Sequence, residues 1–421
     1  MRAFFLFLTL AVCSQTFAQV PYVRALVDSL CSDRYAGRGY VDQGDKKAAL
    51  FLSNEMEEIG LSPLNGDSYL QSFEFPVNSF PGSVYLSLNG LPLEPGSAFI
   101  IDPHSPSGSY QGEVFLINHK FVKKKNWLEK LKTTWDGKQP VVIDTRKMEE
   151  EISKTLISLS YELRNLAPIC LIVNQKLTWS VGRSQGKFPA FEVDASKLGK
   201  RKIKSISFGV EAKFIPNHQA FNVCGLLPGK SSDSLVVFSA HYDHLGKMGP
   251  AIFPGANDNA SGTALVMNMA RTLASSDEKL PYDVAFLLFA GEEAGLLGSA
   301  HFTQNPLVKL EEIQVVLNLD IMGTGNEGIT VVNAVEQTKV YETLVKINQE
   351  NQLLEKIKKR KQTQNSDHYW FSQNGVPAVF IYTLGGVRFY HDVQDRSETL
   401  PLDYTDEISN LLLLFLKDYM N

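Results

Sequence analysis

The sequence predicts an α/β fold: a mixed, largely parallel twisted sheet with helices on both faces, and a smaller α/β module inserted into it. Two observations predict the sheet. Long apolar runs of the kind found in strands buried on both faces occur at 235–240, 284–290, 313–319 and 376–383. Segments between them carry apolar residues at helical spacing, as parallel strands require for their crossovers. A third observation, a change to short alternating runs between about 79 and 216, predicts the inserted module.

The composition is that of a globular protein. The 421 residues are 44% hydrophobic and 21% charged, which excludes a disordered, collagen-like or coiled-coil chain. Lysine and arginine number 41 against 46 acidic residues, so the formal net charge is -5. A chain with this balance has no overall basic field for nucleic acid or anionic lipid.

The first 18 residues have the layout of a secretory signal peptide. Met1 and Arg2 precede an apolar run at 3–13, and Ala18 offers a small residue for cleavage. We therefore expect an exported protein, periplasmic or secreted. A lipid anchor on Cys13 is disfavoured, because Val12 stands where a small residue is expected. No later segment is long and apolar enough to span a bilayer.

The main domain is expected at 19–78 and 217–421. At 45–59 the apolar residues recur every three to four positions, which predicts an amphipathic helix; helices are also predicted at 259–274 and 403–420. Within the insert, 79–216, strands are predicted at 83–88, 140–144 and 169–173 and a helix at 147–166. Cys31, Cys170 and Cys224 are too few and too scattered for a disulfide framework, so buried thiols are favoured, with one bridge left open.

Three basic clusters, at 123–125, 200–204 and 356–361, lack interleaved aromatic residues. They are predicted to be solvated faces, not nucleic-acid sites.

Potential metal ligands follow the predicted strands, at the edge where parallel sheets bind ligands. Carboxylates gathered there repel one another unless cations neutralise them, and mixed imidazole and carboxylate ligands suit zinc. Five such ligands exceed the needs of one tetrahedral ion, but fit two ions about 3.5–4 Å apart that share a carboxylate. The residues of ligand type, from which two imidazoles and three carboxylates would make up the five, are His241 and Asp243, Glu292 and Glu293, Asp320, His391, and Asp258 before a predicted helix.

The segments around these residues, 238–246, 255–262, 289–299, 318–320 and 390–391, resemble the zinc aminopeptidase family that also contains glutamate carboxypeptidases, transferrin-receptor ectodomains and glutaminyl cyclases. The insert loosely resembles a protease-associated domain. The resemblance implies that Asp258 bridges two zinc ions and that Glu292 is the general base, with Asp243 orienting an imidazole. It further implies two pairs of ligands, His241 with Asp320 and Glu293 with His391.

The sequence thus predicts an exported di-zinc aminopeptidase acting on peptides with a free N-terminus. A single-zinc glutaminyl cyclase, a carboxypeptidase using Arg388, and a catalytically inactive receptor-like binding module are the alternatives. His244 is expected to be a supporting or surface residue, and Asp367 and His368 to form pocket wall or packing. Thr363 stands where some relatives place a tyrosine that polarises the substrate carbonyl.

Overall fold

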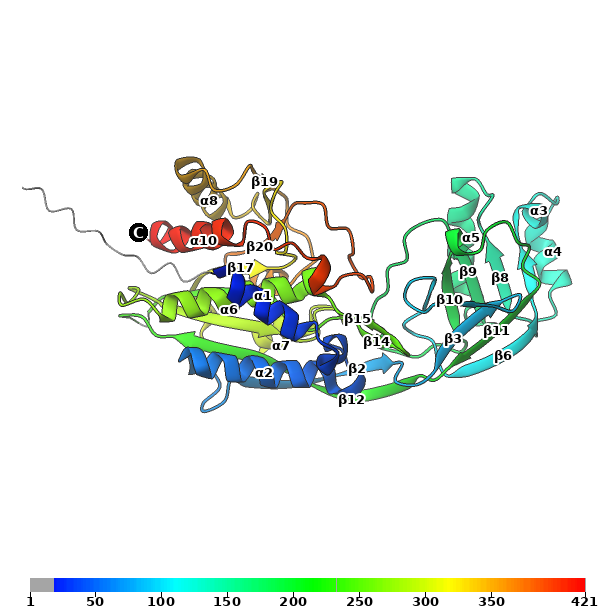
Figure 1. Ribbon diagram of the computed structural model, residues 1–421, viewed down its shortest axis with the longest axis horizontal. Coiled ribbons are helices and arrows are strands. Elements are labelled where there is room, and N and C mark those ends of the chain that lie inside the picture. The colour runs from blue at the N-terminus through cyan, green and yellow to red at the C-terminus, as the bar shows by residue number, and fades with distance from the viewer. Residues whose placement is uncertain (1–18, 232, 421) are drawn as a thin grey trace, which may run out of the picture.

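The computed structural model describes residues 19–231 and 233–420. The predicted signal peptide lies outside the described residues and stays a prediction. Figure 1 shows a larger lobe that carries the first and last described helices, α1 (Gln19–Leu30) and α10 (Thr405–Tyr419), and a smaller lobe formed by the inserted segment.

The larger lobe is built on a sheet of nine strands among the described residues, ordered β1-β12-β16-β13-β17-β20-β18-β19 with β2 paired to β12. Its centre, β16-β13-β17-β20, is parallel, and antiparallel neighbours flank it on both sides. This confirms the predicted mixed, largely parallel sheet. The strands are β1 (Ser62–Pro63), β2 (Leu70–Ser79), β12 (Lys213–Leu227), β13 (Leu235–His241), β16 (Asp283–Phe289), β17 (Ile313–Leu319), β18 (Ile329–Val332), β19 (Ile357–Lys359) and β20 (Ala378–Thr383).

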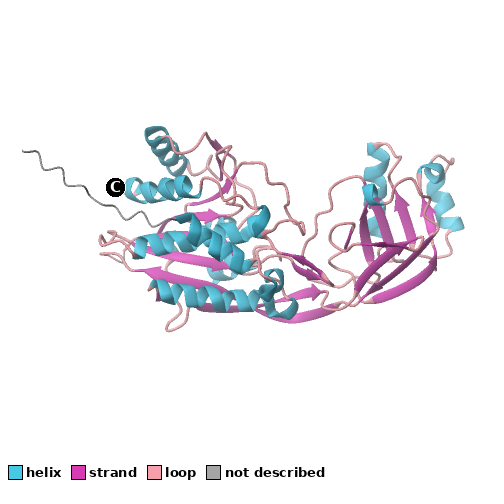
Figure 2. Cartoon of the chain, in the orientation of Figure 1, coloured by secondary structure: helices cyan, strands magenta, loops and turns pink. Residues whose placement is uncertain are grey.

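Helices cover both faces of this sheet (Figure 2). Val236 and Phe238 of β13 belong to the core under the first group of helices, whereas Leu235 and Val237 belong to the core under the second. Burial of alternate residues on opposite faces explains why these strands are apolar throughout. The first group is α1 (Gln19–Leu30), α2 (Gly44–Ile59), α6 (Ser261–Ala274) and α10 (Thr405–Tyr419); the second is α7 (Leu297–Gln304) and α9 (His368–Gln373), while α8 (Thr338–Asn351) packs on α10.

The predicted helix at 259–274 begins two residues late, at Ser261. Asp258 (φ -114°, ψ 93°) and Asn259 have non-helical backbone angles, within the irregular turn η4 (Ala256–Ala260). That turn holds the Asp258 carboxylate at the edge of the sheet. Other single-turn helices are η1 (Asp33–Arg38), η2 (Val41–Gln43), η3 (Ala195–Lys197), η5 (Leu310–Glu312) and η6 (Ser397–Thr399).

The smaller lobe has its own core between two sheets. One sheet is antiparallel, in the order β4-β3-β11-β6; the other, β5-β10-β9-β8-β7, is parallel from β10 to β7. The elements are β3 (Val84–Leu88), β4 (Leu91–Leu93), β5 (Phe99–Ile101), β6 (Gly108–Glu113), β7 (Phe115–Ile117), α3 (His119–Val122), α4 (Trp127–Thr134), β8 (Val141–Asp144), α5 (Glu150–Leu163), β9 (Ile169–Val173), β10 (Ala190–Asp194) and β11 (Ser205–Val210). The predicted helix at 147–166 is shortened at both ends.

The lobes are connected by β2 and β12. These two strands pair with each other from Ser79 opposite Lys213 to Leu70 opposite Val223. The expected insert boundaries therefore fall within paired strands. A hairpin of the larger lobe, β14 (Gly246–Met248) and β15 (Ala251–Phe253), also reaches the core of the insert, where Phe253 lies 4.7 Å from Trp179 between ring centroids.

Cys31, Cys170 and Cys224 are free thiols in the described structure. No helix within residues 19–231 and 233–420 combines the length and hydropathy of a membrane span.

Candidate metal centre

The predicted ligands meet at the carboxyl edge of the large sheet because each follows a strand that ends there. His241 is the last residue of β13, Glu293 and Asp320 follow β16 and β17, and His391 lies in the loop after β20. Asp258 reaches the same edge from η4. All five side chains are at least nine-tenths buried.

Asp258 lies between the two imidazoles. Its Oδ1 is 3.4 Å from His241 Nε2, and its Oδ2 is 3.3 Å from His391 Nε2. Each imidazole also faces a second carboxylate: His241 Nε2 lies 3.4 Å from Asp320 Oδ1, and His391 Nε2 lies 3.1 Å from Glu293 Oε2. The five residues thus form two groups of donors that share one carboxylate.

The spacing of these atoms fits zinc. At a ligand distance of about 2.0–2.1 Å, neighbouring ligands of a tetrahedral zinc ion lie about 3.3–3.4 Å apart, which matches the four separations of 3.1–3.4 Å. In addition, Asp320 Oδ1 is buried without a hydrogen-bond partner in the described structure. A buried acceptor of this kind fits a metal ligand.

The electrostatics also favour a cation. Burial opposes charge on His391, yet the carboxylates of Glu293 and Asp258 raise its pKa to about 11. Burial likewise opposes charge on His241, and Glu292 and Asp320 outweigh it to raise its pKa well above the ordinary value. The carboxylates therefore strongly stabilise positive charge next to the two Nε2 atoms. A divalent ion bound there carries more positive charge than a proton.

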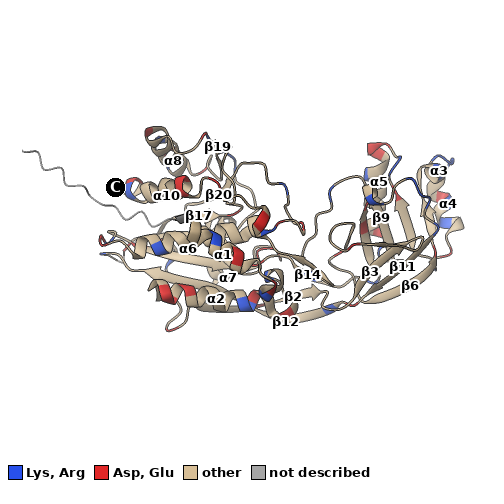
Figure 3. Cartoon of the chain, in the orientation of Figure 1, with Lys and Arg blue, Asp and Glu red and all other residues tan. Residues whose placement is uncertain are grey.

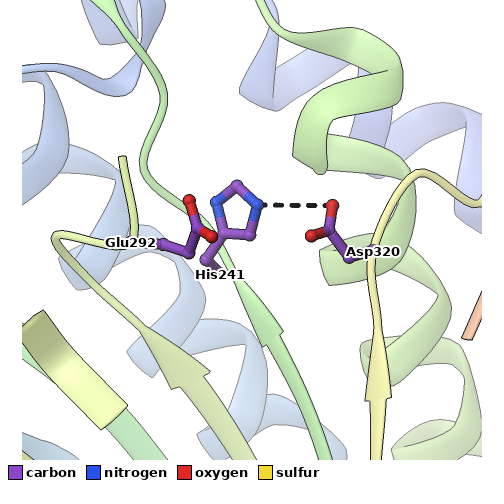
Figure 4. A group of neighbouring side chains, drawn as sticks. All are labelled: His241, Glu292 and Asp320. Atoms are coloured by element: carbon purple, nitrogen blue, oxygen red, sulfur yellow. Dashed lines mark ion pairs between the residues drawn. The ribbon is translucent and has the colours of Figure 1, made fainter. Parts of the chain in front are cut away.

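Glu292 lies beside the first group of donors, with its carboxylate near the ring of His241 (Figure 4). His241, Glu292 and Asp320 each offer an atom within 4.8 Å of the others. No hydrogen bond to the Glu292 carboxylate is present among the described residues, so the group is available to a substrate or a water.

Backbone carbonyls orient the imidazoles. His391 Nδ1 lies 2.7 Å from the carbonyl oxygen of Trp179, in the insert, and His241 Nδ1 lies 3.1 Å from that of Asp243. The Asp243 carboxylate, predicted to orient His241, is 3.8 Å from Nδ1 and beyond hydrogen-bond distance. It accepts instead from the backbone N–H of Glu292 at 3.2 Å. Burial, opposed by His241, raises the pKa of Asp243 to about 8.

Three side chains outside the predicted ligand set hold the carboxylates and the turn that carries Asp258. His244 is fully buried and its Nδ1 lies 2.7 Å from Glu293 Oε1, so it supports this candidate ligand and is not a surface residue. The Ser366 hydroxyl donates to Asp320 Oδ2 at 2.8 Å. Asp395 accepts from the backbone N–H groups of Asn257 and Asp258 and anchors the turn.

Arg38, at the end of η1, is fully buried and has no carboxylate partner among the described residues. Its guanidinium donates four hydrogen bonds, all to backbone carbonyls. The acceptors are Tyr242 (2.7 Å), Leu30 (3.1 Å), Pro254 (2.5 Å) and Gly255 (2.6 Å). Tyr242 follows His241, and Gly255 precedes η4, so one side chain ties together the segments that carry two candidate ligands. No local sequence pattern signals this contact.

A cavity of about 260 Å³ opens onto the donors. Besides His241, Asp258, Glu292, Asp320 and His391, it is lined by Ile321, Arg360, Asn365, Phe380, Tyr382 and Tyr390. Arg388 is not part of this lining, and its carbonyl accepts from Lys176; the arginine at the cavity is Arg360. Thr363 is also outside the lining. Asp367 and His368 are buried and pack behind the site, where Ser299 donates to Asp367.

Comparison with known proteins agrees with this geometry. Residues 222–416 match the model of Peptidase family M28. A stretch of 123 residues is 37% identical to aminopeptidase YwaD of Bacillus subtilis, covering 28% of this chain and 25% of that protein. A stretch of 182 residues is 29% identical to a probable leucine aminopeptidase of Trichophyton verrucosum, covering 40% of this chain and 47% of that protein. The matches thus span less than half of these relatives' length.

Solved structures resemble nearly the whole chain. A zinc aminopeptidase from Bacillus subtilis superimposes with a TM-score of 0.68 at 19% identity, and 94% of each chain is covered. A peptidase M28 precursor from Shewanella amazonensis gives a TM-score of 0.66 at 16% identity, covering 95% of this chain and 93% of the other. At these identities the likeness establishes the two-lobed fold.

Proposed function

We propose that this protein is a zinc-dependent exopeptidase, and specifically an aminopeptidase that holds two zinc ions, because residues 222–416 match the model of Peptidase family M28. The observation that carries the proposal is the Asp258 carboxylate, which presents one oxygen to each of two imidazoles. In this assignment His241 and Asp320 would hold one ion and Glu293 and His391 the other, with Asp258 as a ligand shared by both.

The reaction proposed is hydrolysis of the N-terminal peptide bond. Zinc supplies Lewis acidity, which makes water nucleophilic at neutral pH and polarises a carbonyl. Glu292 takes the proton of the attacking water and returns it to the leaving amine. Asp243 keeps Glu292 in place by accepting from its backbone N–H. The Trp179 carbonyl fixes the ring of His391 so that Nε2 faces Glu293 and Asp258.

Three observations support an exopeptidase, and an aminopeptidase in particular. The cavity at the donors, about 260 Å³, is smaller than the roughly 300–1,000 Å³ of typical ligand pockets, so it suits a single residue at the end of a chain. Both relatives described above are named aminopeptidases. The buried carboxylates beside the cavity suit a protonated N-terminal amine.

Arg360 favours a second candidate, a carboxypeptidase. It is exposed at the wall of the cavity and has no acidic partner among the described residues. A guanidinium in that position would pair with a C-terminal carboxylate. The same arginine in an aminopeptidase would instead favour an acidic first residue, so the two candidates differ in which end of the peptide must be free.

We also propose that the protein is exported, on the basis of the layout of its first 18 residues. The three described cysteines are free thiols, so the fold requires no disulfide bridge. Periplasmic or secreted destinations are told apart by fractionating cells that express the full chain.

The deciding experiment combines metal content with end-group specificity. Protein purified without chelator is assayed for zinc per chain and for activity on aminoacyl-chromogenic substrates and their N-acetylated counterparts. The same protein is incubated with a C-terminally amidated peptide, an N-acetylated peptide with a free C-terminus, and a glutaminyl peptide. An aminopeptidase should contain about two zinc ions and require only the free amine. Cleavage of acetylated peptides with a free C-terminus would establish the carboxypeptidase instead. Conversion of glutaminyl peptides to pyroglutamyl peptides without hydrolysis, with one zinc, would establish a cyclase.

A further inference from the structure

A second cavity, of about 730 Å³, lies in the insert. It opens at the carboxyl edge of the sheet β5-β10-β9-β8-β7, since Asn118, Asn174 and Ala195 follow β7, β9 and β10 directly and all line it. This edge of a parallel sheet is where α/β folds bind ligands, and the volume is within the usual range for a ligand site. It shares no lining residue with the cavity at the metal centre.

The wall of this insert cavity is strongly basic. Six exposed cations line it, and none has an ion-pair partner in the described part of the chain: Lys120, Lys124, Lys147, Lys200, Arg201 and Lys202. The chain as a whole carries a net charge of -5, so this concentration is a local feature. Figure 3 shows the basic segments around α3 and beside α5 at the open end of the smaller lobe.

The two acidic residues in the wall already have other partners. Asp144 forms a two-point ion pair with Arg146, whose Nε and Nη2 lie 2.8 and 2.6 Å from its oxygens. Asp194 accepts from both the backbone N–H and the hydroxyl of Ser196, each at 2.8 Å. Neither carboxylate therefore pairs with the six lining cations.

The basic wall is held in place by the fold. Arg146 also donates to the carbonyls of Gly199 at 2.6 Å and Arg201 at 2.8 Å, and the Asn89 amide donates to that of Lys202 at 2.8 Å. These bonds fix the segment 199–202 opposite Lys120 and Lys124. Two basic runs that are 75 or more residues apart in the sequence, and that we predicted to be separate solvated faces, thus converge on one cavity.

We propose that the insert cavity binds an acidic peptide segment, one carrying several aspartate or glutamate side chains. Several cations spread over a cavity of this size match several separate carboxylates better than one compact anion. A compact phosphate site would favour a buried guanidinium fork, but the part-buried Arg146 is committed to Asp144, and Arg201, the other arginine of the wall, is exposed. A nucleic-acid site would offer free aromatic faces. Phe121 instead lies edge-on to Phe115, with Lys124 5.0 Å above its ring.

The test is binding of octaglutamate, acetylated at its N-terminus and labelled with a fluorophore at its C-terminus, followed by fluorescence anisotropy. Both ends are blocked, so no exopeptidase activity interferes and failure of the proposed function would not affect the result. The test variant combines Lys200→Glu, Arg201→Glu and Lys202→Glu. The matched control combines Lys130→Glu, Lys132→Glu and Lys138→Glu, exposed positions of the insert that do not line the cavity and that give the same change of charge.

The full chain should bind octaglutamate at low ionic strength and should release it as the salt concentration is raised. It should show no measurable binding of octaglutamine. The 200–202 variant should bind about tenfold or more weakly, and the control within about twofold of the unmodified chain, because only the first loses contacts. Equal weakening in both variants, or no binding by the full chain, would overturn the proposal. Tighter binding of tripolyphosphate or a single-stranded oligonucleotide than of octaglutamate would also overturn it. Unchanged thermal unfolding of the 200–202 variant confirms that it folds.

Discussion

Replacing Arg38 by methionine tests whether one buried cation positions the metal centre. Methionine retains most of the aliphatic volume but leaves four carbonyl groups without their donors. Hydrogen bonds to a charged group contribute about 1.5–3 kcal/mol each, so the gross loss is about 6–12 kcal/mol. Removing the buried guanidinium recovers a desolvation cost of several kcal/mol. The Arg38→Met variant should therefore unfold with a free energy about 3–5 kcal/mol lower.

The loss should extend to metal binding, because two of the four carbonyls belong to Tyr242 and Gly255, next to the segments that carry His241 and Asp258. The assay is urea unfolding of metal-free protein by circular dichroism, together with zinc titration of each folded variant. Arg183→Met is the matched control, since Arg183 is exposed and lies outside both cavities. Arg38→Lys keeps the charge but not the planar fork, so it should fall between the wild type and Arg38→Met.

Two results would refute this reasoning. If Arg38→Met unfolds within about 1 kcal/mol of the wild type, the four hydrogen bonds do not contribute as their geometry implies. If it is strongly destabilised but the folded protein binds zinc with unchanged affinity, Arg38 stabilises the lobe without positioning the ligands.

The remaining predictions concern the metal centre and its cavity. Glu292→Gln should keep its zinc, since this side chain is assigned as proton carrier, while kcat falls about 10²–10⁴-fold; loss of zinc measured by metal analysis would contradict that role. Ser366→Ala removes the donor to Asp320 and should weaken zinc binding about 10–100-fold in competition with a chelating dye, and an unchanged affinity would show that the hydroxyl is dispensable. Arg360→Met should lower kcat/KM for substrates that begin with glutamate more than for those that begin with leucine, and an equal change in both would exclude Arg360 from substrate selection. Removal of zinc by dialysis against chelator should lower the unfolding temperature, because an ion present at 100 times its Kd stabilises the folded state by about 2.7 kcal/mol, and calorimetry before and after adding zinc back measures the shift.

Much of the fold could be predicted because its signals are local. The four central strands were recognised from runs such as 235–240 and 313–319, since burial on both faces makes such a strand apolar along its whole length. Helix ends were less predictable. The predicted start at 259 was wrong because the backbone at Asp258 and Asn259 serves the site and does not continue the helix.

The candidate ligands could also be predicted, because topology alone brings the carboxyl ends of parallel strands to one edge. The sequence by itself thus determined the fold class and which side chains meet: His241, Asp258, Glu293, Asp320 and His391, with Glu292 beside them.

Only the tertiary structure decided what holds those side chains and what surrounds them. Three features show this: the Trp179 carbonyl at His391, the four carbonyls at Arg38, and the convergence of two basic runs in the insert. Except for the contact with Leu30, each joins residues that are 50 or more positions apart in the sequence. All of these acceptors are backbone carbonyls, which every residue possesses. Composition and spacing cannot mark such contacts, because they exist only once the chain has brought distant segments together.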